Sequence, residues 1–197
     1  MSNQKAQASH KNSKVAYRWD MVFAGAMLML CFGTVYAWSY FQEPLMQTFG
    51  WNNAQVSLVF SLAIFFLGMA AAVGGVILPN AGPRKIAMIG SALFCLGYLL
   101  AAIALSLKSL ALLYLGYSLI GGTGLGLGYV TPVATVSKWF QEKKGLATGM
   151  VIMGFGFGAL FMSKVIAPIF LRLYTGNLVN SFLTFALLFA AITIPAS

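Results

Sequence analysis

Ionisable side chains are scarce within the long apolar stretches of this chain, so each one bears on the chemistry that it can perform. Lys164 is the only cation well inside such a stretch, and Glu43 lies at the end of another. If these stretches cross a bilayer, both residues are expected near its outer boundary. There they could attract an anion or pair as a gate, because an unpaired charge in lipid costs at least about 2.5 kcal/mol. The alternative is that Lys164 extends its ammonium group to the outer headgroups.

Residues for acid–base or nucleophilic catalysis are missing from these stretches. The single histidine, His10, lies in the polar N-terminal region, and no carboxylate pair or nucleophile–base set can be assembled. Cys31 and Cys95 lack the spacing of a metal or redox pair and are expected to be small buried hydrophobes. We therefore predict that the chain is not an enzyme and that it has no catalytic residues, metal site or cofactor.

Aromatic hydroxyls are the second group of side chains that could bind a ligand. Tyr36 and Tyr40 are four residues apart and share a helical face, and Tyr129 and Thr131 form a similar polar patch further along the chain. These four residues predict a polar, uncharged cavity wall. The alternative is a belt of interfacial aromatic side chains.

The composition requires these residues to be positioned by membrane-spanning helices. The 197 residues are 60% hydrophobic and 8% charged, with a mean hydropathy of +0.86, whereas about a quarter of a soluble domain is charged. A spanning helix needs about 20 apolar residues. The sequence predicts an all-α membrane protein, a bundle of six transmembrane helices within residues 19–197, at about 21–41, 54–78, 86–107, 110–136, 146–171 and 181–197.

The distribution of charge predicts the orientation of the chain. The net charge is +9, and nine of the 12 Lys and Arg residues lie in the polar tail (1–18) and in the two loops on the same side of the bundle. The excess of cations in cytoplasmic loops places the N-terminus and this basic tail in the cytoplasm of a multi-pass protein, in the cell (inner) membrane. No stretch shows the interleaved basic and aromatic residues of a nucleic-acid groove, so the expected partner is the lipid bilayer and not nucleic acid.

Glycine and proline indicate how the helices pack and where they bend. Pairs of glycines four residues apart place bare backbone on one face, which lets helices in lipid approach closely. This pattern fits either a transporter whose helices slide or a static bundle. Asn52 and Gln55 predict a helix cap, Pro79 and Gly82 a helix end, and Pro132 and Pro168 kinks. The packing glycines are Gly122, Gly124, Gly126, Gly128, Gly154 and Gly158.

The sixth apolar stretch is short. The stretch from Ser181 to Ile194 is only 14 residues long, and no cationic flank follows it. We expect the sixth helix to be truncated.

Several motifs in fixed order resemble the N-terminal half of a major facilitator superfamily transporter, and within it the oxalate/formate antiporter family. The resemblance runs from about residue 20 to residue 168. It implies twelve helices in two six-helix halves, a central substrate site, alternating access and small carboxylate substrates such as oxalate, formate or related monocarboxylates. The motifs are VYAWS at 35–39, FGW at 49–51, GPRK at 82–85, GLGYVTP at 126–132, KWF at 138–140, GLATG at 145–149 and GFGFG at 154–158.

The superfamily's cytoplasmic gate loop maps onto Gly75 through Gly82, followed by Arg84 and Lys85. Pro79 stands where the family has an aspartate, so the family's charge relay is not carried over.

The resemblance implies that this chain is the N-terminal half of an alternating-access carboxylate transporter. A second six-helix half, or a second copy of this chain, would then supply the missing counter-charge for the substrate. Two alternatives stay open, namely an inactive truncated fragment and a half-size membrane scaffold that acts through helix–helix contacts.

Overall fold

Long apolar helices account for most of the computed structural model, which describes residues 19, 21–174 and 176–196. Within these residues six helices are long and apolar enough to cross a membrane, which confirms the predicted all-α bundle. The basic tail at 1–18 lies outside the described residues. Spans 1 to 6 are Met21–Phe49, Asn53–Ala81, Pro83–Ser106, Leu110–Trp139, Lys144–Leu173 and Leu178–Ala196.

The first two spans continue beyond the ends that the sequence predicts. Span 1 consists of a helix at 21–33, a 3₁₀ turn η1 (Thr34–Ala37) and α2 (Trp38–Phe49), which continues through Pro44. Helix α3 (Asn53–Ala81) likewise contains Pro79 and ends at Gly82, whose φ is +84°. A hydropathy window registers only the apolar part of a helix. These helix ends lie instead at glycines with positive φ, Gly50 and Gly82.

The predicted cap at the start of span 2 is confirmed. The amide of Gln55 donates to Oδ1 of Asn52 over 2.8 Å, and the amide of Asn52 donates to Oε1 of Gln55 over 3.0 Å. Two backbone N–H groups of the first helical turn thereby gain acceptors that the helix itself does not offer.

Spans 4 and 5 each contain a π-helical segment. Span 4 consists of α5 (Leu110–Leu113), η2 (Tyr114–Gly121) and α6 (Gly122–Trp139), and α6 continues through Pro132. Span 5 consists of α7 (Lys144–Phe161), η3 (Met162–Ile166) and α8 (Ala167–Leu173), with Pro168 in the first turn of α8. Because span 5 is helical without a break through η3 into α8, Pro168 leaves the preceding turn one backbone N–H donor short.

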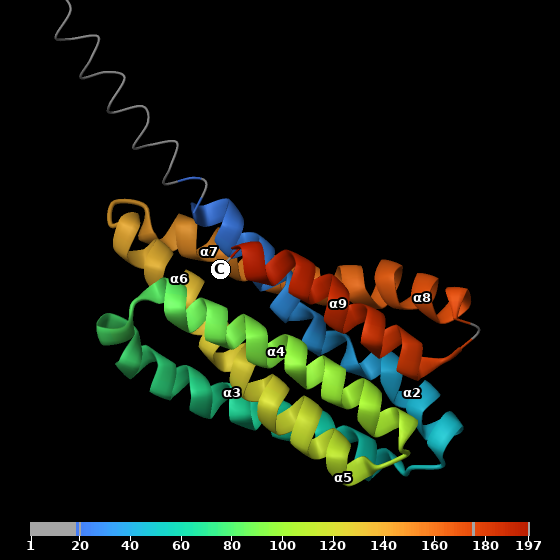
Figure 1. Ribbon diagram of the computed structural model, residues 1–197. Coiled ribbons are helices and arrows are strands. Elements are labelled where there is room, and N and C mark those ends of the chain that lie inside the picture. The colour runs from blue at the N-terminus through green and yellow to red at the C-terminus, as the bar shows by residue number, and fades with distance from the viewer. Residues whose placement is uncertain (1–18, 20, 175, 197) are drawn as a thin grey trace, which may run out of the picture.

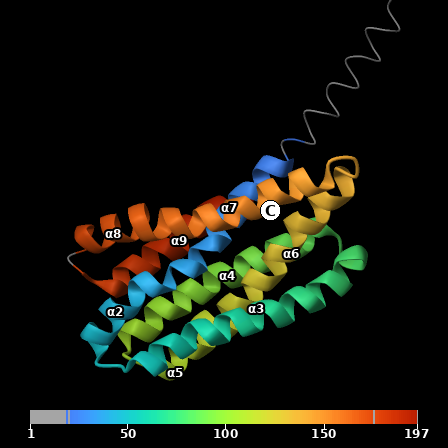
Figure 2. The ribbon, with the colours of Figure 1, turned by 180° about the vertical axis from the view of Figure 1, so that it is seen from behind.

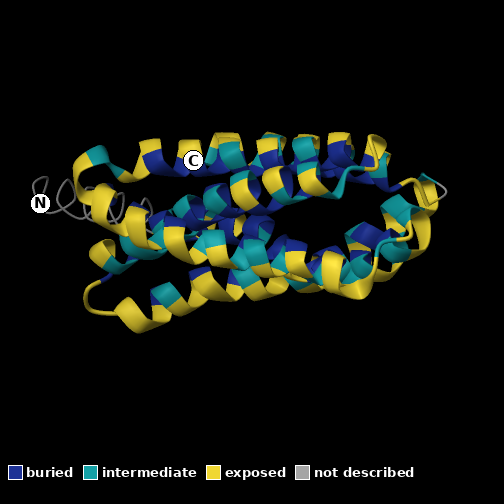
Figure 3. Ribbon diagram, turned by 90° about the horizontal axis from the view of Figure 1, so that it is seen from below, coloured by how far each residue is buried: buried dark blue, intermediate teal, exposed yellow. Residues whose placement is uncertain are grey.

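The spans pack around a core of aromatic and small residues (Figures 1 and 2). Helix α4 (Pro83–Ser106) contacts both α6 and α9 (Leu178–Ala196), while α3 packs on α6 and α7 packs on span 1. Phe32, Phe94 and Phe189 are fully buried, and buried faces line the inside of the bundle in Figure 3. Spans 2 and 5 are the least buried of the six.

Glycines set the closest helix contacts. A Cβ added at any of the six glycines named above would come closer than 3 Å to an atom of another span. At Gly154 that atom is the carbonyl oxygen of Ala26 at 2.6 Å, and at Gly122 it is the carbonyl oxygen of Ala63 at 2.6 Å. Only glycine fits such backbone-to-backbone approaches, and in lipid they replace the hydrophobic drive that water would supply.

Candidate functional site

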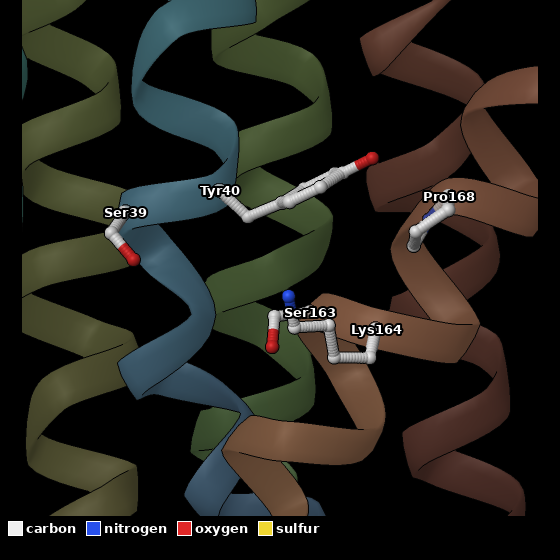
Figure 4. A pocket seen from close by; sticks show the side chains of 5 residues that line it. All are labelled: Ser39, Tyr40, Ser163, Lys164 and Pro168. Carbon is white, nitrogen blue, oxygen red and sulfur yellow. The ribbon is translucent and has the colours of Figure 1, made fainter.

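A pocket of about 500 Å³ lies between spans 1 and 5 (Figure 4). Span 1 contributes Ser39 and Tyr40, and span 5 contributes Ser163, Lys164 and Pro168. Figure 4 shows the Lys164 side chain lying along its own helix with its nitrogen turned towards span 1. The structure thus brings two of the residues singled out in the sequence, Tyr40 and Lys164, to one cavity.

Local helix geometry positions the span 5 side of this pocket. Ser163 and Lys164 lie in the π-helical segment η3, and Pro168 follows in the first turn of α8. The hydroxyl of Ser163 donates to the carbonyl oxygen of Ala159 over 2.8 Å. Its oxygen therefore faces the pocket only as an acceptor, and the ammonium group of Lys164 is the charged donor.

A strip of aromatic ring contacts joins four spans of the bundle. Tyr36 is 46% exposed and packs edge-on against Phe60 of span 2 and Phe155 of span 5, with centroid distances of 5.9 and 5.4 Å. Phe155 also contacts Tyr129 of span 4 over 5.4 Å. Tyr36 and Tyr129 therefore belong to one wall, joined through a phenylalanine.

Thr131 does not belong to that wall, which corrects the grouping inferred from the sequence. It is 4% exposed, and its hydroxyl donates to the carbonyl oxygen of Leu127 over 3.0 Å. It lines a different cavity, at the end of the bundle where Arg84 lies. Residues two apart on a helix point in nearly opposite directions, so Tyr129 and Thr131 cannot share a face.

Glu43 and Lys164 are not brought together in this structure. Glu43 accepts a hydrogen bond from the side chain of Gln47 over 3.2 Å and is not among the residues that line the Lys164 pocket. The paired gate inferred from these two residues is therefore not formed in this conformation, and Lys164 instead opens onto the pocket.

The loop between spans 2 and 3 is a tight connection at the basic end of the bundle. Gly82 adopts a positive φ between α3 and α4, and Arg84 and Lys85 are exposed in the first turn of α4. Gly75 lies on an exposed part of α3, where an added Cβ would meet only Val130, at 3.9 Å.

Ser163 and Pro168 line the pocket but were not chosen from the sequence. A usable signal was the proline four residues after Lys164, because Pro168 removes a backbone donor from the turn that holds Lys164.

The pocket presents donor groups of the kind that bind a small anion. An ammonium group forms charge-assisted hydrogen bonds with a carboxylate, and the hydroxyls of Ser39 and Tyr40 add neutral donors. Across the described residues there is no group of three or more His, Cys, Asp or Glu that could hold a metal ion.

Relatives of known type match most of this chain. It is 27% identical over 164 residues to an oxalate:formate antiporter of Oxalobacter formigenes, covering 83% of this chain and 38% of the relative. It is 31% identical over 141 residues to monocarboxylate transporter 13 of Rattus norvegicus, covering 72% and 31%. It is 30% identical over 190 residues to apicoplast pyruvate carrier 1 of Toxoplasma gondii, covering 75% and 34%.

The match to these relatives is confined to part of their length. The chain spans between 31% and 38% of the three relatives named above. The family profile described as Major Facilitator Superfamily matches residues 22–196, which takes in all six spans. The chain belongs to the Major Facilitator Superfamily, a family of membrane transporters.

Proposed function

We propose that this chain forms the N-terminal half of a transporter that moves small carboxylates across a membrane by alternating access. The observation that carries the proposal is the pocket of about 500 Å³ between spans 1 and 5, into which Lys164 brings a positive charge. The printed names of an oxalate:formate antiporter, a monocarboxylate transporter and a pyruvate carrier among the relatives support this class of substrate.

The charge of the pocket favours a single carboxylate group on this side of the substrate. Lys164 is the one charged residue among those that line it. A monocarboxylate could be neutralised by this ammonium group alone. A dicarboxylate such as oxalate would need a second cation, which we assign to the part of the transporter that faces spans 2 and 5.

Spans 2 and 5 present the face on which that part would dock. A Cβ added at Gly68, Gly149 or Gly156 would meet no atom within 4 Å. Large apolar side chains lie exposed beside these glycines, among them Met69 and Phe157. We infer that a second six-helix half covers this face and completes the substrate cavity, because the matched relatives are more than twice as long as the matched region. A second copy of this chain is the alternative occupant.

We also propose that the N-terminus and the loops after spans 2 and 4 face the cytoplasm of a cell membrane. Arg84, Lys85, Lys138, Lys143 and Lys144 are all exposed in these loops or at their helix ends. Labelling checks this in intact cells with a membrane-impermeant maleimide. A cysteine at Thr48 (T48C) should react, and one at Gly145 (G145C) should react only after permeabilisation. The opposite pattern would reverse the orientation.

Counterflow tests the transport proposal. The encoding DNA is read on from position 197, and the protein with its second half is reconstituted in liposomes loaded with formate, oxalate or pyruvate. We expect labelled carboxylate to accumulate against its own gradient, whereas uptake of a neutral analogue such as formamide should not exceed that of protein-free liposomes. Failure of the completed protein to exchange any small carboxylate would eliminate the proposal and favour an inactive fragment or a scaffold.

A further inference from the structure

A second cavity, of about 420 Å³, lies at the basic end of the bundle and shares no lining residue with the Lys164 pocket. It is enclosed by spans 1, 3, 4 and 6, and its walls are largely apolar, with Met21, Leu28, Ala87 and Val136 among the lining residues. It lies where the end of α9 approaches the first turns of span 1 and α4 (Figure 1).

This cavity has few polar groups, and they differ in charge and in the hydrogen bonds that they can donate. Among the described residues that line it, Arg84, in the first turn of α4, is the one that carries a charge, and Thr131 and Thr135 contribute hydroxyls. Thr131 already donates its proton to the carbonyl oxygen of Leu127, so it offers only an acceptor. The guanidinium group therefore dominates recognition, and it presents donors in a planar fork that matches phosphate oxygens.

Two further cations lie near Arg84 but do not line the cavity. Lys85 and Lys138 are exposed at the same end of the bundle and do not line the cavity. Basic pockets between transmembrane helices bind anionic lipid headgroups, because the charge lies at headgroup level and the walls lie in hydrocarbon. A free anion would leave the apolar walls in contact with water, whereas an acyl chain would cover them.

We propose that this cavity binds an anionic phospholipid, with its phosphate at the guanidinium group of Arg84 and an acyl chain against Met21, Ala24 and Pro195. The site is independent of the proposed transport function. All of the residues that would bind the lipid belong to this chain, so the site does not need a second six-helix half. A bound lipid would also link the ends of spans 1, 3, 4 and 6.

Native mass spectrometry of the purified 197-residue chain tests the proposal. Phosphatidylglycerol and phosphatidylcholine with identical dioleoyl chains are titrated into detergent solutions of the protein. We expect phosphatidylglycerol to be retained preferentially, and Arg84→Gln to weaken its retention at least about tenfold, because the variant loses the charge-assisted hydrogen bonds to the phosphate. The matched control is Lys138→Gln, which removes an exposed cation outside the cavity and should change retention less than twofold.

Two further measurements separate a lipid site from a site for any anion. Ala24→Phe fills the cavity from span 1 while leaving Arg84 in place, and it should also reduce retention of phosphatidylglycerol. Glycerol 3-phosphate, which carries the headgroup chemistry without acyl chains, should not displace the lipid. Its displacement at equal concentration would overturn the lipid assignment in favour of a free phosphate site.

Equal retention of the two lipids, or unchanged retention in Arg84→Gln, would also overturn the proposal. Circular dichroism reports whether each variant is folded. If Ala24→Phe does not fold, the headgroup competition on the native chain and the Arg84→Gln titration still decide the question.

Discussion

Lys164 faces the pocket from a turn that departs from the α-helix. It lies in the π-helical segment η3, and Pro168, four residues later, offers no N–H to that turn. The cation therefore lies in a turn that departs from α-helical hydrogen bonding, and Ser163 and Pro168 line the same cavity. Features of this kind often occur at functional sites in helices. At the scale of single residues, this turn is the part of span 5 with the clearest chemical role.

Replacing Lys164 tests that role. Lys164→Gln should raise the KM for carboxylate in counterflow at least about tenfold, because a hydrogen bond to a charged group contributes about 1.5–3 kcal/mol. Lys164→Arg keeps the charge and should retain most of the affinity. Arg172→Gln removes an exposed cation of the same span that does not line the pocket, and it should leave KM unchanged. Equal effects of Lys164→Gln and Arg172→Gln would contradict the assignment.

Helix α7 has two different faces. Gly154 and Gly158 contact the backbone of span 1, where an added Cβ would come within 3 Å of the carbonyl oxygens of Ala26 and Leu30. Gly156, between them, faces open space. Glycines on one face of α7 thus permit close packing on span 1, whereas Gly156 lies on a face that the six described spans leave uncovered.

A pair of alanine substitutions tests whether the two faces of α7 differ in how closely they are packed. Gly154→Ala forces α7 away from span 1 and should lower the free energy of unfolding by about 1–3 kcal/mol, the usual cost of overpacking. Gly156→Ala meets no atom and should be neutral, or stabilising by up to about 1 kcal/mol, because alanine favours the helix over glycine. Unfolding of the purified variants in detergent measures both, and a cost at Gly156 would contradict this packing.

At the scale of the whole molecule, the bundle is complete on one side and open on another. The aromatic core is closed by α4 and α9, with Phe94 and Phe189 in ring contact at 5.6 Å. Spans 2 and 5 are the least buried and present small residues next to exposed apolar ones. Close approach of small residues is how helices associate in lipid. This distribution supports the docking face inferred above.

A bulky substitution tests the docking face without disturbing the bundle. Gly156→Trp should leave the thermal unfolding of the 197-residue chain unchanged, yet it should prevent co-purification with the second six-helix half. Leu99→Trp, on an exposed part of α4 away from this face, should have no effect on either. Mass determination of the native assembly distinguishes a second half from a second copy. Unimpaired association of Gly156→Trp would remove spans 2 and 5 as the interface.

The sequence by itself determined the class of fold and the number of spans. Hydrocarbon imposes this result, because every backbone polar group must be paired within its own helix and each helix must be long enough to cross. The sequence also determined the cap at Asn52, since that cap is a contact between residues three apart. Local chemistry of this kind does not depend on how the helices are assembled.

Only the tertiary structure decided which polar residues share a cavity. Tyr40 joins Lys164, Tyr129 joins Tyr36 through Phe155, and Thr131 turns to the cavity of Arg84. The physical reason is rotation. Tyr129 and Thr131 lie together in the regular helix α6, where the period of 3.6 already points them apart. For residues of different spans, the rotation of each helix about its own axis decides which side chains meet, and the 3₁₀ and π segments in spans 1, 4 and 5 alter that rotation because they change the number of residues per turn.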